Sequence, residues 1–322
     1  MRRLFANANY DFLSARRITL PISAVAILLI ALAAAFFQVR SGTWLNYGVD
    51  FTGGSIIQFR IAGESVSEAQ VRAVATAAAP GATVSAFGDE NEFRVRMPST
   101  GTDAATQSSQ AVMQALRAQF GEQNVELESE DSVGAKVGSE LQSRALIAIL
   151  VSFAATLIYL AIRFEWRFGV AAVIATLHDI LLTIGFLLLL RLEVSLPTVA
   201  AVLTILGYSL NDTIVIFDRI RENLKTAKRQ EFLAVLNRSI NDTLPRTVLT
   251  TATTLVTLLS LYLFGGVIIR EFALILIVGI LLGTYSSIFI AAPALLEIEK
   301  RFPHEQKHAR RPRAAAPRPT RV

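Results

Sequence analysis

The sequence predicts a polytopic α-helical membrane protein with six transmembrane helices and one α+β domain. Hydrophobic residues make up 52% of the 322 residues and charged residues only 18%, a balance that lies beyond that of a soluble domain of this length. Six predominantly apolar runs each reach the length that a helix needs to cross a bilayer. Between the first two runs, about a hundred residues alternate between strand-like and helix-like patterns, which indicates a folded domain outside the membrane.

The apolar runs place the membrane spans, and the basic residues orient them. The spans are predicted at residues 18–39, 141–162, 168–190, 196–217, 246–264 and 272–296. Arginine and lysine concentrate before the first span, between the second and third, between the fourth and fifth, and after the sixth. Because basic loops stay in the cytoplasm, we expect both termini to be cytoplasmic, including residues 1–17, and residues 40–140 to lie across the membrane.

Residues 40–140 contain the elements of a ferredoxin-like domain, in which two helices cover one face of an antiparallel sheet. The predicted order βαββαβ has strands at 55–61, 83–87, 93–97 and 125–132 and helices at 67–79 and 103–120. Ser67 and Gln70 form a capping-box signature, and Gly121 follows the end of the second helix. The domain is acidic and contains no histidine. A binding or mechanical role is therefore expected rather than catalysis.

A glycine-rich segment, Gly48-Val-Asp-Phe-Thr-Gly-Gly54, precedes this domain. Glycine permits turns that other residues resist, so the segment is either a plain linker or a specific structural motif. The residues that would form such a motif are Gly48, Asp50, Phe51, Gly53 and Gly54.

The cytoplasmic loop at residues 218–245 carries apolar residues at helical spacing among charged ones. They are Phe232, Leu233, Leu236 and Ile240. This pattern predicts an amphipathic helix that lies on the membrane surface and ends at Pro245.

The tail at residues 297–322 is rich in arginine and proline and has few large apolar residues, so we expect it to be disordered and drawn to anionic lipid. The net charge of +5 resides on this tail and on the cytoplasmic loops. The positive-inside bias accounts for it, and nucleic acid is not expected as a partner.

The residue inventory limits the chemistry that the chain can perform. It has no cysteine and only three histidines, two of them in the tail, so disulfides, thiolate catalysis and a structural metal site are not expected. It has no phosphate-binding loop, so an ion gradient is favoured over ATP as the energy source. We therefore expect no cofactor, no catalytic residue and coupling to protons.

The fourth span contains a carboxylate, Asp212, about 9 Å from its cytoplasmic end. An intramembrane carboxylate costs a few kcal/mol and usually faces a bundle interior or a wet cavity, which makes an ion path the default hypothesis. Ser209, Asn211 and Thr213 are its polar neighbours, and Arg246 at the start of the fifth span is the nearest candidate counter-charge. Taken alone, Arg246 also fits an ordinary interfacial anchor.

Burial and an arginine act in opposite directions on a carboxylate, so Asp212 could load and release a proton as the geometry around it changes. We therefore predict that Asp212 and Arg246 form a proton pathway.

Two further polar groups lie inside the spans. His178 and Asp179 occupy the middle of the third span, where an interhelical hydrogen bond and a role in the ion path are both open interpretations. Thr247, Thr250 and Thr254 share one face of the fifth span and suit either a hydrated lining or close packing with hydrogen bonds to their own helix.

Four motifs together resemble the SecF subunits of the bacterial protein-export membrane complex, members of the resistance-nodulation-division superfamily. The motifs are Gly48-Val-Asp-Phe-Thr-Gly-Gly54, Leu177-His-Asp-Ile180, Gly207-Tyr-Ser-Leu-Asn-Asp-Thr213 with Phe217-Asp-Arg-Ile-Arg-Glu-Asn223, and Asn237-Arg-Ser-Ile-Asn-Asp-Thr-Leu-Pro-Arg-Thr247. The resemblance covers nearly the whole chain except its tail.

This resemblance implies a subunit of the inner membrane that pairs with a homologous SecD and works beside the SecYEG channel, the ATPase SecA and YajC. Such subunits use the proton-motive force to promote the export of unfolded preproteins, and residues 40–140 would then be periplasmic. By motif, Asp212 and Arg246 fall on the proton-path positions of the family.

Two other functions fit parts of the pattern. A proton-driven exporter of small molecules or lipids would use the same intramembrane charges, but such exporters normally have twelve spans in one chain. An intramembrane aspartyl protease would need Asp179 and Asp212 to lie close together, and the sequence around Asp212 differs from the Gly-x-Gly-Asp of those proteases.

Overall fold

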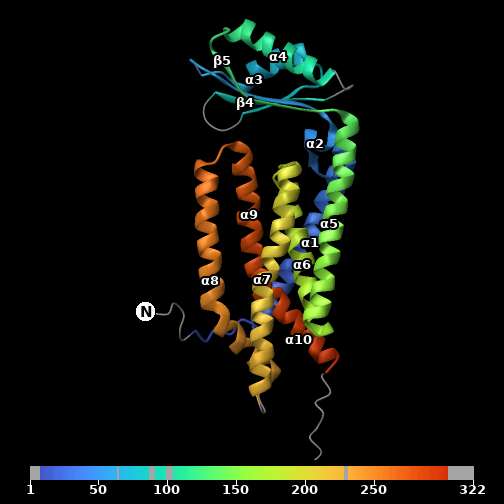
Figure 1. Cartoon of the computed structure of the whole chain (residues 1–322), viewed down its shortest axis with the longest axis vertical. Helices are drawn as coiled ribbons and strands as arrows, with labels where there is room; N and C mark the ends of the chain where they lie inside the picture. The colour runs from blue at the N-terminus through green and yellow to red at the C-terminus, as the bar shows by residue number, and fades with distance from the viewer. Residues whose placement is uncertain (1–7, 64, 87–90, 99–103, 228–230, 304–322) are drawn as a thin grey trace, which may run out of the picture.

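The computed structural model describes residues 8–63, 65–86, 91–98, 104–227 and 231–303. Figure 1 shows a helical bundle with a small sheet domain at one end and helix α10 at the opposite end. Within these described ranges, six helices are long and apolar enough to cross a membrane. The predicted fold class, six transmembrane helices with a ferredoxin-like domain between the first two, is confirmed.

The long helices divide into an inner and an outer set. In chain order they are α1 (Arg16–Ser41), α5 (Ala135–Arg163), α6 (Trp166–Leu189), α7 (Leu196–Thr226), α8 (Phe232–Phe264) and α9 (Val267–Ser286), which continues through the π-helix η1 (Ser287–Ala291) into α10 (Ala292–Arg301). About half of each apolar stretch of α6, α7 and α9 is buried, against 6% for α1 and α5. The inner helices therefore form the core, and α1 and α5 present apolar faces suited to lipid or a partner.

The sheet domain has the predicted strand and helix order. Its elements are β2 (Gly54–Ile61), α3 (Glu68–Ala78), β3 (Thr83–Ala86), β4 (Glu92–Met97), α4 (Ala104–Phe120) and β5 (Val125–Val133). The strands lie in the order β3-β4-β2-β5, and each neighbouring pair is antiparallel. Alternate residues of β2 and β4, such as Phe59 and Val95, pack under α3 and α4. Gln58 and Arg94 point to the other face, toward the bundle.

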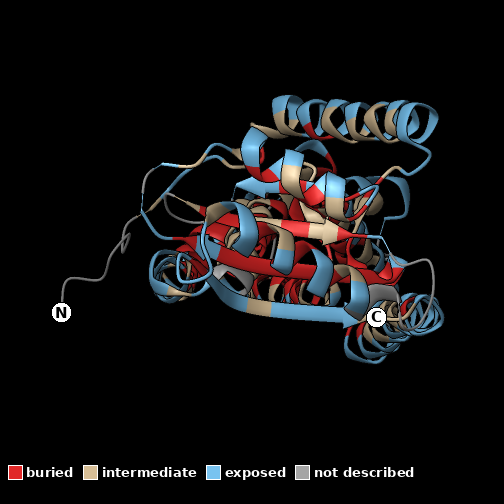
Figure 2. Cartoon of the chain, turned by 90° about the horizontal axis from the view of Figure 1, so that it is seen from above, coloured by how far each residue is buried: buried red, intermediate tan, exposed pale blue. Residues whose placement is uncertain are grey.

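Figure 2 looks down on this domain and shows buried strands beneath helices whose outer turns are exposed. The strand β5 forms one edge of the sheet, and most of its residues are exposed. Residues 87 and 103, the predicted ends of a strand and a helix, lie outside the described residues.

The helix α3 begins with the predicted capping box. The Ser67 side chain accepts from the Gln70 backbone N–H, and the Gln70 side chain accepts from the Ser67 backbone N–H at 2.9 Å. These bonds satisfy two of the four backbone donors that a helix start leaves unpaired.

We expect Ser67→Ala to weaken α3 by about 1 kcal/mol, because the cap is lost. Hydrogen exchange of the whole protein should then show the first amides of α3 about fivefold less protected. Ser65→Ala, two residues earlier at another exposed position, is the control. Equal protection in both variants would show that the cap does not stabilise this helix.

The predicted separation of an amphipathic surface helix from the fifth span is wrong. A single helix, α8, runs from Phe232 to Phe264 with Pro245 inside it. Leu236 and Ile240 are fully buried in the core between the helices, so this part packs against the bundle and does not lie on a membrane surface.

In the turns before Pro245, side chains add hydrogen bonds to the backbone of the helix. The Asn241 amide donates to the carbonyl of Asn237 at 2.8 Å, and the Thr243 hydroxyl donates to the carbonyl of Ser239 at 3.1 Å. Neither bond reaches the carbonyl of Asn241, which Pro245 leaves without its helical donor, so burial of this part of α8 in the core accounts for the continuous helix.

The predicted disordered tail begins too early. Residues 297–301 belong to α10, where Arg167 forms an ion pair with Glu299 at 2.7 Å and the ring of Trp166 meets that of Phe302. This packing against the start of α6 orders the segment. The rest of the predicted tail, residues 304–322, lies outside the described residues.

Candidate functional site

Asp212 lies in the interior of the bundle, on α7. It is 4% exposed, and both the charge of Arg246 on α8 and the hydroxyl of Thr284 on α9 interact with its carboxylate. Three helices, α7, α8 and α9, thus surround this acid and keep it out of contact with lipid. The arrangement agrees with the predicted inward-facing position, which is where an intramembrane carboxylate serves an ion path.

Arg246 is exposed, whereas Asp212 is buried. The described structure contains no ion pair within 4.0 Å between these two side chains. The arginine therefore acts on the acid through its field while it remains accessible at the surface of the bundle. Thr247, the next residue, is buried, and the described residues offer its hydroxyl no hydrogen-bond partner. Asp212 and Arg246 can therefore change their charge states without breaking a direct contact.

Asp179 on α6 is the centre of a second buried polar group. It is 1% exposed and accepts hydrogen bonds from the hydroxyls of Ser209 on α7 and Ser286 on α9, the latter at 2.6 Å. The His178 ring nitrogen Nδ1 lies 3.0 Å from the same carboxylate. Its other ring nitrogen, Nε2, lies 3.1 Å from the Ser23 hydroxyl on α1. This cluster joins four helices, as the interhelical interpretation of His178 and Asp179 expects.

Asp179 and Asp212 have different partners, but the partners of both include residues at the contact between α7 and α9. Ser209 precedes Asp212 by three residues, so the bond to Asp179 holds α7 one turn away from Asp212. Thr213, the residue after Asp212, forms a hydrogen bond between its hydroxyl and that of Ser287 at 2.8 Å.

The close approach of α7 and α9 depends on small residues. A side chain at Gly283 would come within 2.9 Å of Ser209, and one at Gly279 within 2.2 Å of the Ile205 side chain. Directly after this contact the helix widens into the π-helix η1. Such bulges recur at functional sites, where they re-aim the side chains of one turn.

The other predicted polar residues divide into two groups. Thr250 and Thr254 donate to carbonyls of their own helix at 3.0 and 2.9 Å, and Thr254 also meets the Tyr208 hydroxyl. These bonds fit close packing rather than a hydrated lining. Asn211 is exposed on the outer face of α7, so it does not join the cluster around Asp212.

The glycine-rich segment is a built structural motif. Gly53 has a φ of +72°, and a side chain there would come within 2.6 Å of the Ala135 backbone at the start of α5. Phe51 is buried, and Gly54 also has a positive φ. At Gly48, whose φ is negative, a side chain would come nearest to the movable end of the Glu193 side chain, at 2.6 Å. The backbone at Gly53 and Gly54 therefore favours glycine, which a plain linker would not need.

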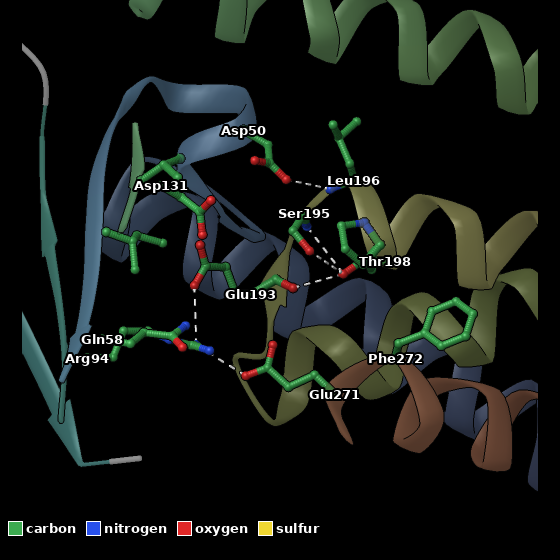
Figure 3. A pocket seen from close by; sticks show the side chains of 13 residues that line it. Asp50, Gln58, Arg94, Asp131, Glu193, Ser195, Leu196, Thr198, Glu271 and Phe272 are labelled. Carbon is green, nitrogen blue, oxygen red and sulfur yellow. Dashed lines mark hydrogen bonds and ion pairs between the residues drawn. The ribbon is translucent and has the colours of Figure 1, made fainter. Parts of the chain in front are cut away.

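An ionic cluster that the sequence does not predict joins the sheet domain to the bundle. Arg94 on β4 forms ion pairs with Glu271 at the start of α9 and with Glu193 in the short strand β6 (Glu193–Val194), at 3.2 and 3.7 Å. It lines a cavity of about 280 Å³ beneath the sheet (Figure 3). The alternation of β4 could have shown that Arg94 faces away from the domain core. No local pattern could have identified its partners.

Burial raises the pKa of Glu193, although Arg96 and Arg94 oppose this effect and the nearby Glu271 and Asp50 add to it. The folded state therefore holds a proton more readily than the unfolded chain does. Stability falls as pH rises from the ordinary value of 4.5 through the raised pKa, because only the folded state must release a proton in that window.

Glu193→Gln should remove this dependence. On acidification toward pH 4.5, the unfolding temperature of the wild type should rise relative to that of the variant, measured in detergent over a pH series. Other titrating groups are common to both proteins and cancel in the difference. A difference that stays constant, or that grows with rising pH, would show that Glu193 is not stabilised in its neutral form.

Sequence families and solved structures resemble this chain over most of its length. Residues 112–301 match the family described as "Protein export membrane protein SecD/SecF, C-terminal", and residues 41–62 match the "SecD/SecF GG Motif". The second match contains the glycine-rich segment that packs against α5.

Individual relatives agree. The protein translocase subunit SecF of Gemmatimonas aurantiaca is 43% identical over 310 residues, which cover 94% of this chain and 91% of that protein. The subunit SecF of Rickettsia prowazekii is 38% identical and covers 89% of this chain. The crystal structure of SecDF, a translocon-associated membrane protein from Thermus thermophilus, has a TM-score of 0.75 and 37% identity over 92% of this chain, which spans 39% of that longer chain. The chain therefore belongs to the SecD/SecF family of protein export membrane proteins.

Proposed function

We propose that this chain is a SecF-like subunit of a protein translocase, which uses the proton-motive force to promote the export of preproteins. The observation that carries this proposal is the buried acid Asp212, which α7, α8 and α9 surround and whose carboxylate interacts with Arg246 and Thr284. The relatives named protein translocase subunit SecF favour protein export over the export of small molecules or lipids.

The partner is a SecD homologue that covers the exposed side of the site. Arg246 and the apolar residues Leu249 and Val256 of α8 are exposed on this chain. An exposed apolar face that carries a functional arginine suits a second membrane subunit better than lipid. Because SecDF of Thermus thermophilus is a single chain of which this one spans 39%, the remaining part corresponds to that partner.

Proton movement supplies the work. Loading a proton on Asp212 neutralises the acid and removes its attraction to Arg246, so the preferred packing of α7 against α8 and α9 changes. A unit charge that crosses the membrane field gains about 2.3 kcal/mol per 100 mV, so a few protons per cycle can drive a conformational change of several kcal/mol. This conformational cycle is coupled to protons and needs no other cofactor.

The chain lies in the bacterial inner membrane with both termini in the cytoplasm and the sheet domain in the periplasm. The excess of basic residues at the α10 end of the bundle supports this orientation. In that position the sheet domain meets the preprotein as it leaves the SecYEG channel, after SecA has begun its transfer, and YajC is an accessory partner.

The test is export into membrane vesicles that contain SecYEG, SecA and this chain with its SecD partner. A proton gradient should accelerate completion of export, and an ionophore that collapses the gradient should remove the acceleration. Vesicles without this chain are the control and should show the SecA-driven rate alone. Equal stimulation with and without the chain would contradict the proposed function.

A further inference from the structure

The glycine-rich segment attaches the sheet domain to the first turn of α7. The backbone N–H of Leu196 donates to the Asp50 carboxylate at 2.8 Å (Figure 3). A helix start leaves such donors unpaired, and a carboxylate there is favoured by the helix dipole. Next to this bond, the strand β1 (Asn46–Tyr47) pairs with β6, and the Gly48 N–H donates to the Val194 carbonyl at 2.8 Å.

The chain between this attachment and the sheet is short. Asp50 lies in the short helix α2 (Val49–Thr52), and strand β2 begins only two residues after that helix. The turn at Gly53 touches the backbone of α5 so closely that no side chain fits there. A displacement of the α7 start is therefore passed directly to the central strand of the sheet.

A second attachment joins the sheet to α9. Arg94 lies on β4, the other central strand, with a side chain only 13% exposed, and its ion pair with Glu271 reaches the first turns of α9. Removing one partner of an enclosed ion pair destabilises a protein because the other charge is left buried without a partner. An exposed pair contributes little to stability. The sheet is thus fixed to the starts of two different helices.

The same two helices enclose the acid of the proton path. Asp212 follows Leu196 by 16 residues on α7, about 24 Å along the axis, and Thr284 follows Glu271 by 13 residues on α9, about 20 Å. Neither helix is interrupted between these positions. A change in the packing of α7 against α9 around Asp212 therefore moves the two points on which the sheet rests.

We propose that Asp50 and Arg94 are positioning residues that transmit movements of α7 and α9 to the sheet domain. They take no part in carrying protons. This inference rests on the proposed function, because it assigns to these residues the step between proton movement and export.

The experiment measures proton flux and gradient-stimulated export in the same proteoliposomes, with the chain paired with its SecD partner. Asp50→Ala should reduce stimulated export at least fivefold and leave proton flux within twofold of the wild type. Asp50→Asn keeps an oxygen that accepts from the Leu196 N–H, and should retain more than half of the export.

Arg94→Gln tests the second attachment and should also reduce export while sparing proton flux. Its matched control is Arg72→Gln, which removes an arginine paired with Glu68 on the outer helix α3. The control should export normally. Normal export in both Asp50→Ala and Arg94→Gln would overturn the inference, and so would a parallel loss of proton flux and export.

A cross-link separates lost attachment from misfolding. The chain has no cysteine, so Tyr47→Cys and Val194→Cys, which are partners in the β1–β6 pairing, would give one unique link. In the Asp50→Ala background, a short thiol cross-linker should restore export at least twofold. Failure to restore it in a folded variant would overturn the transmission role. A wild type without gradient-dependent flux or export would instead contradict the proposed function.

Discussion

Asp212→Asn is expected to abolish gradient-stimulated export, a loss of at least about tenfold on the scale of removing a proton-transfer group. Asparagine has the size of aspartate and can still accept a hydrogen bond from Thr284, so the packing of the three helices is kept. It cannot bind and release a proton at physiological pH. Export measured in vesicles should therefore fall to the SecA-driven rate, which the gradient no longer raises.

The matched control is Asp218→Asn, the same change on the same helix. Asp218 forms an ion pair with Arg163 at 2.6 Å on the exposed surface, so its loss should leave stimulation near the wild-type level. Arg246→Met should behave like Asp212→Asn, because it removes the positive charge that interacts with the Asp212 carboxylate. Normal stimulation in either variant would remove that residue from the mechanism.

Gly53→Ala is expected to have the largest effect on folding. An alanine there must adopt a φ of +72° with a ψ of 162°, a backbone region that only glycine occupies readily and that costs about 1–3 kcal/mol. Its methyl group must also displace the backbone of α5, which adds about 1–3 kcal/mol as overpacking. The change should lower the unfolding temperature of the purified protein and reduce its amount in the membrane.

Gly42→Ala is the control for a glycine with a positive φ and no close contact. Gly42 has a φ of +73° and a ψ of −12°, which is the left-handed helical region, and a side chain there meets nothing within 4 Å. It should show only the backbone cost of about 1 kcal/mol. Equal destabilisation by the two substitutions would show that neither the backbone region of Gly53 nor its contact with α5 adds to the cost seen at Gly42.

Local patterns predicted the sheet domain well. The capping box at Ser67, the hairpin of β3 and β4 and the glycine after α4 are signals within a few residues of one another, and the structure has each of them. The failure at Pro245 has the same origin. Its local meaning is a helix end, but burial of Leu236 and Ile240 against the other helices outweighs that preference.

The candidate site was predictable only in part. Asp212 could be found because a carboxylate inside an apolar run needs an explanation wherever the helix packs. The sequence could not show that Ser286 and Ser209 both bond Asp179, since those residues belong to three different helices. The sequence predicts Asp50 only as part of a motif, and its bond to the start of α7 is visible only in the structure.

The sequence by itself determined the six spans, the order of the sheet domain and the buried acid, because hydrophobic runs, caps and misplaced charges are properties of neighbouring residues. The tertiary structure alone decided which distant groups meet. Arg94 reaches Glu271 across 177 positions and Asp50 reaches Leu196 across 146. Such contacts depend on how the helices and the sheet pack, and that packing is set by the sum of many weak contacts rather than by any local pattern.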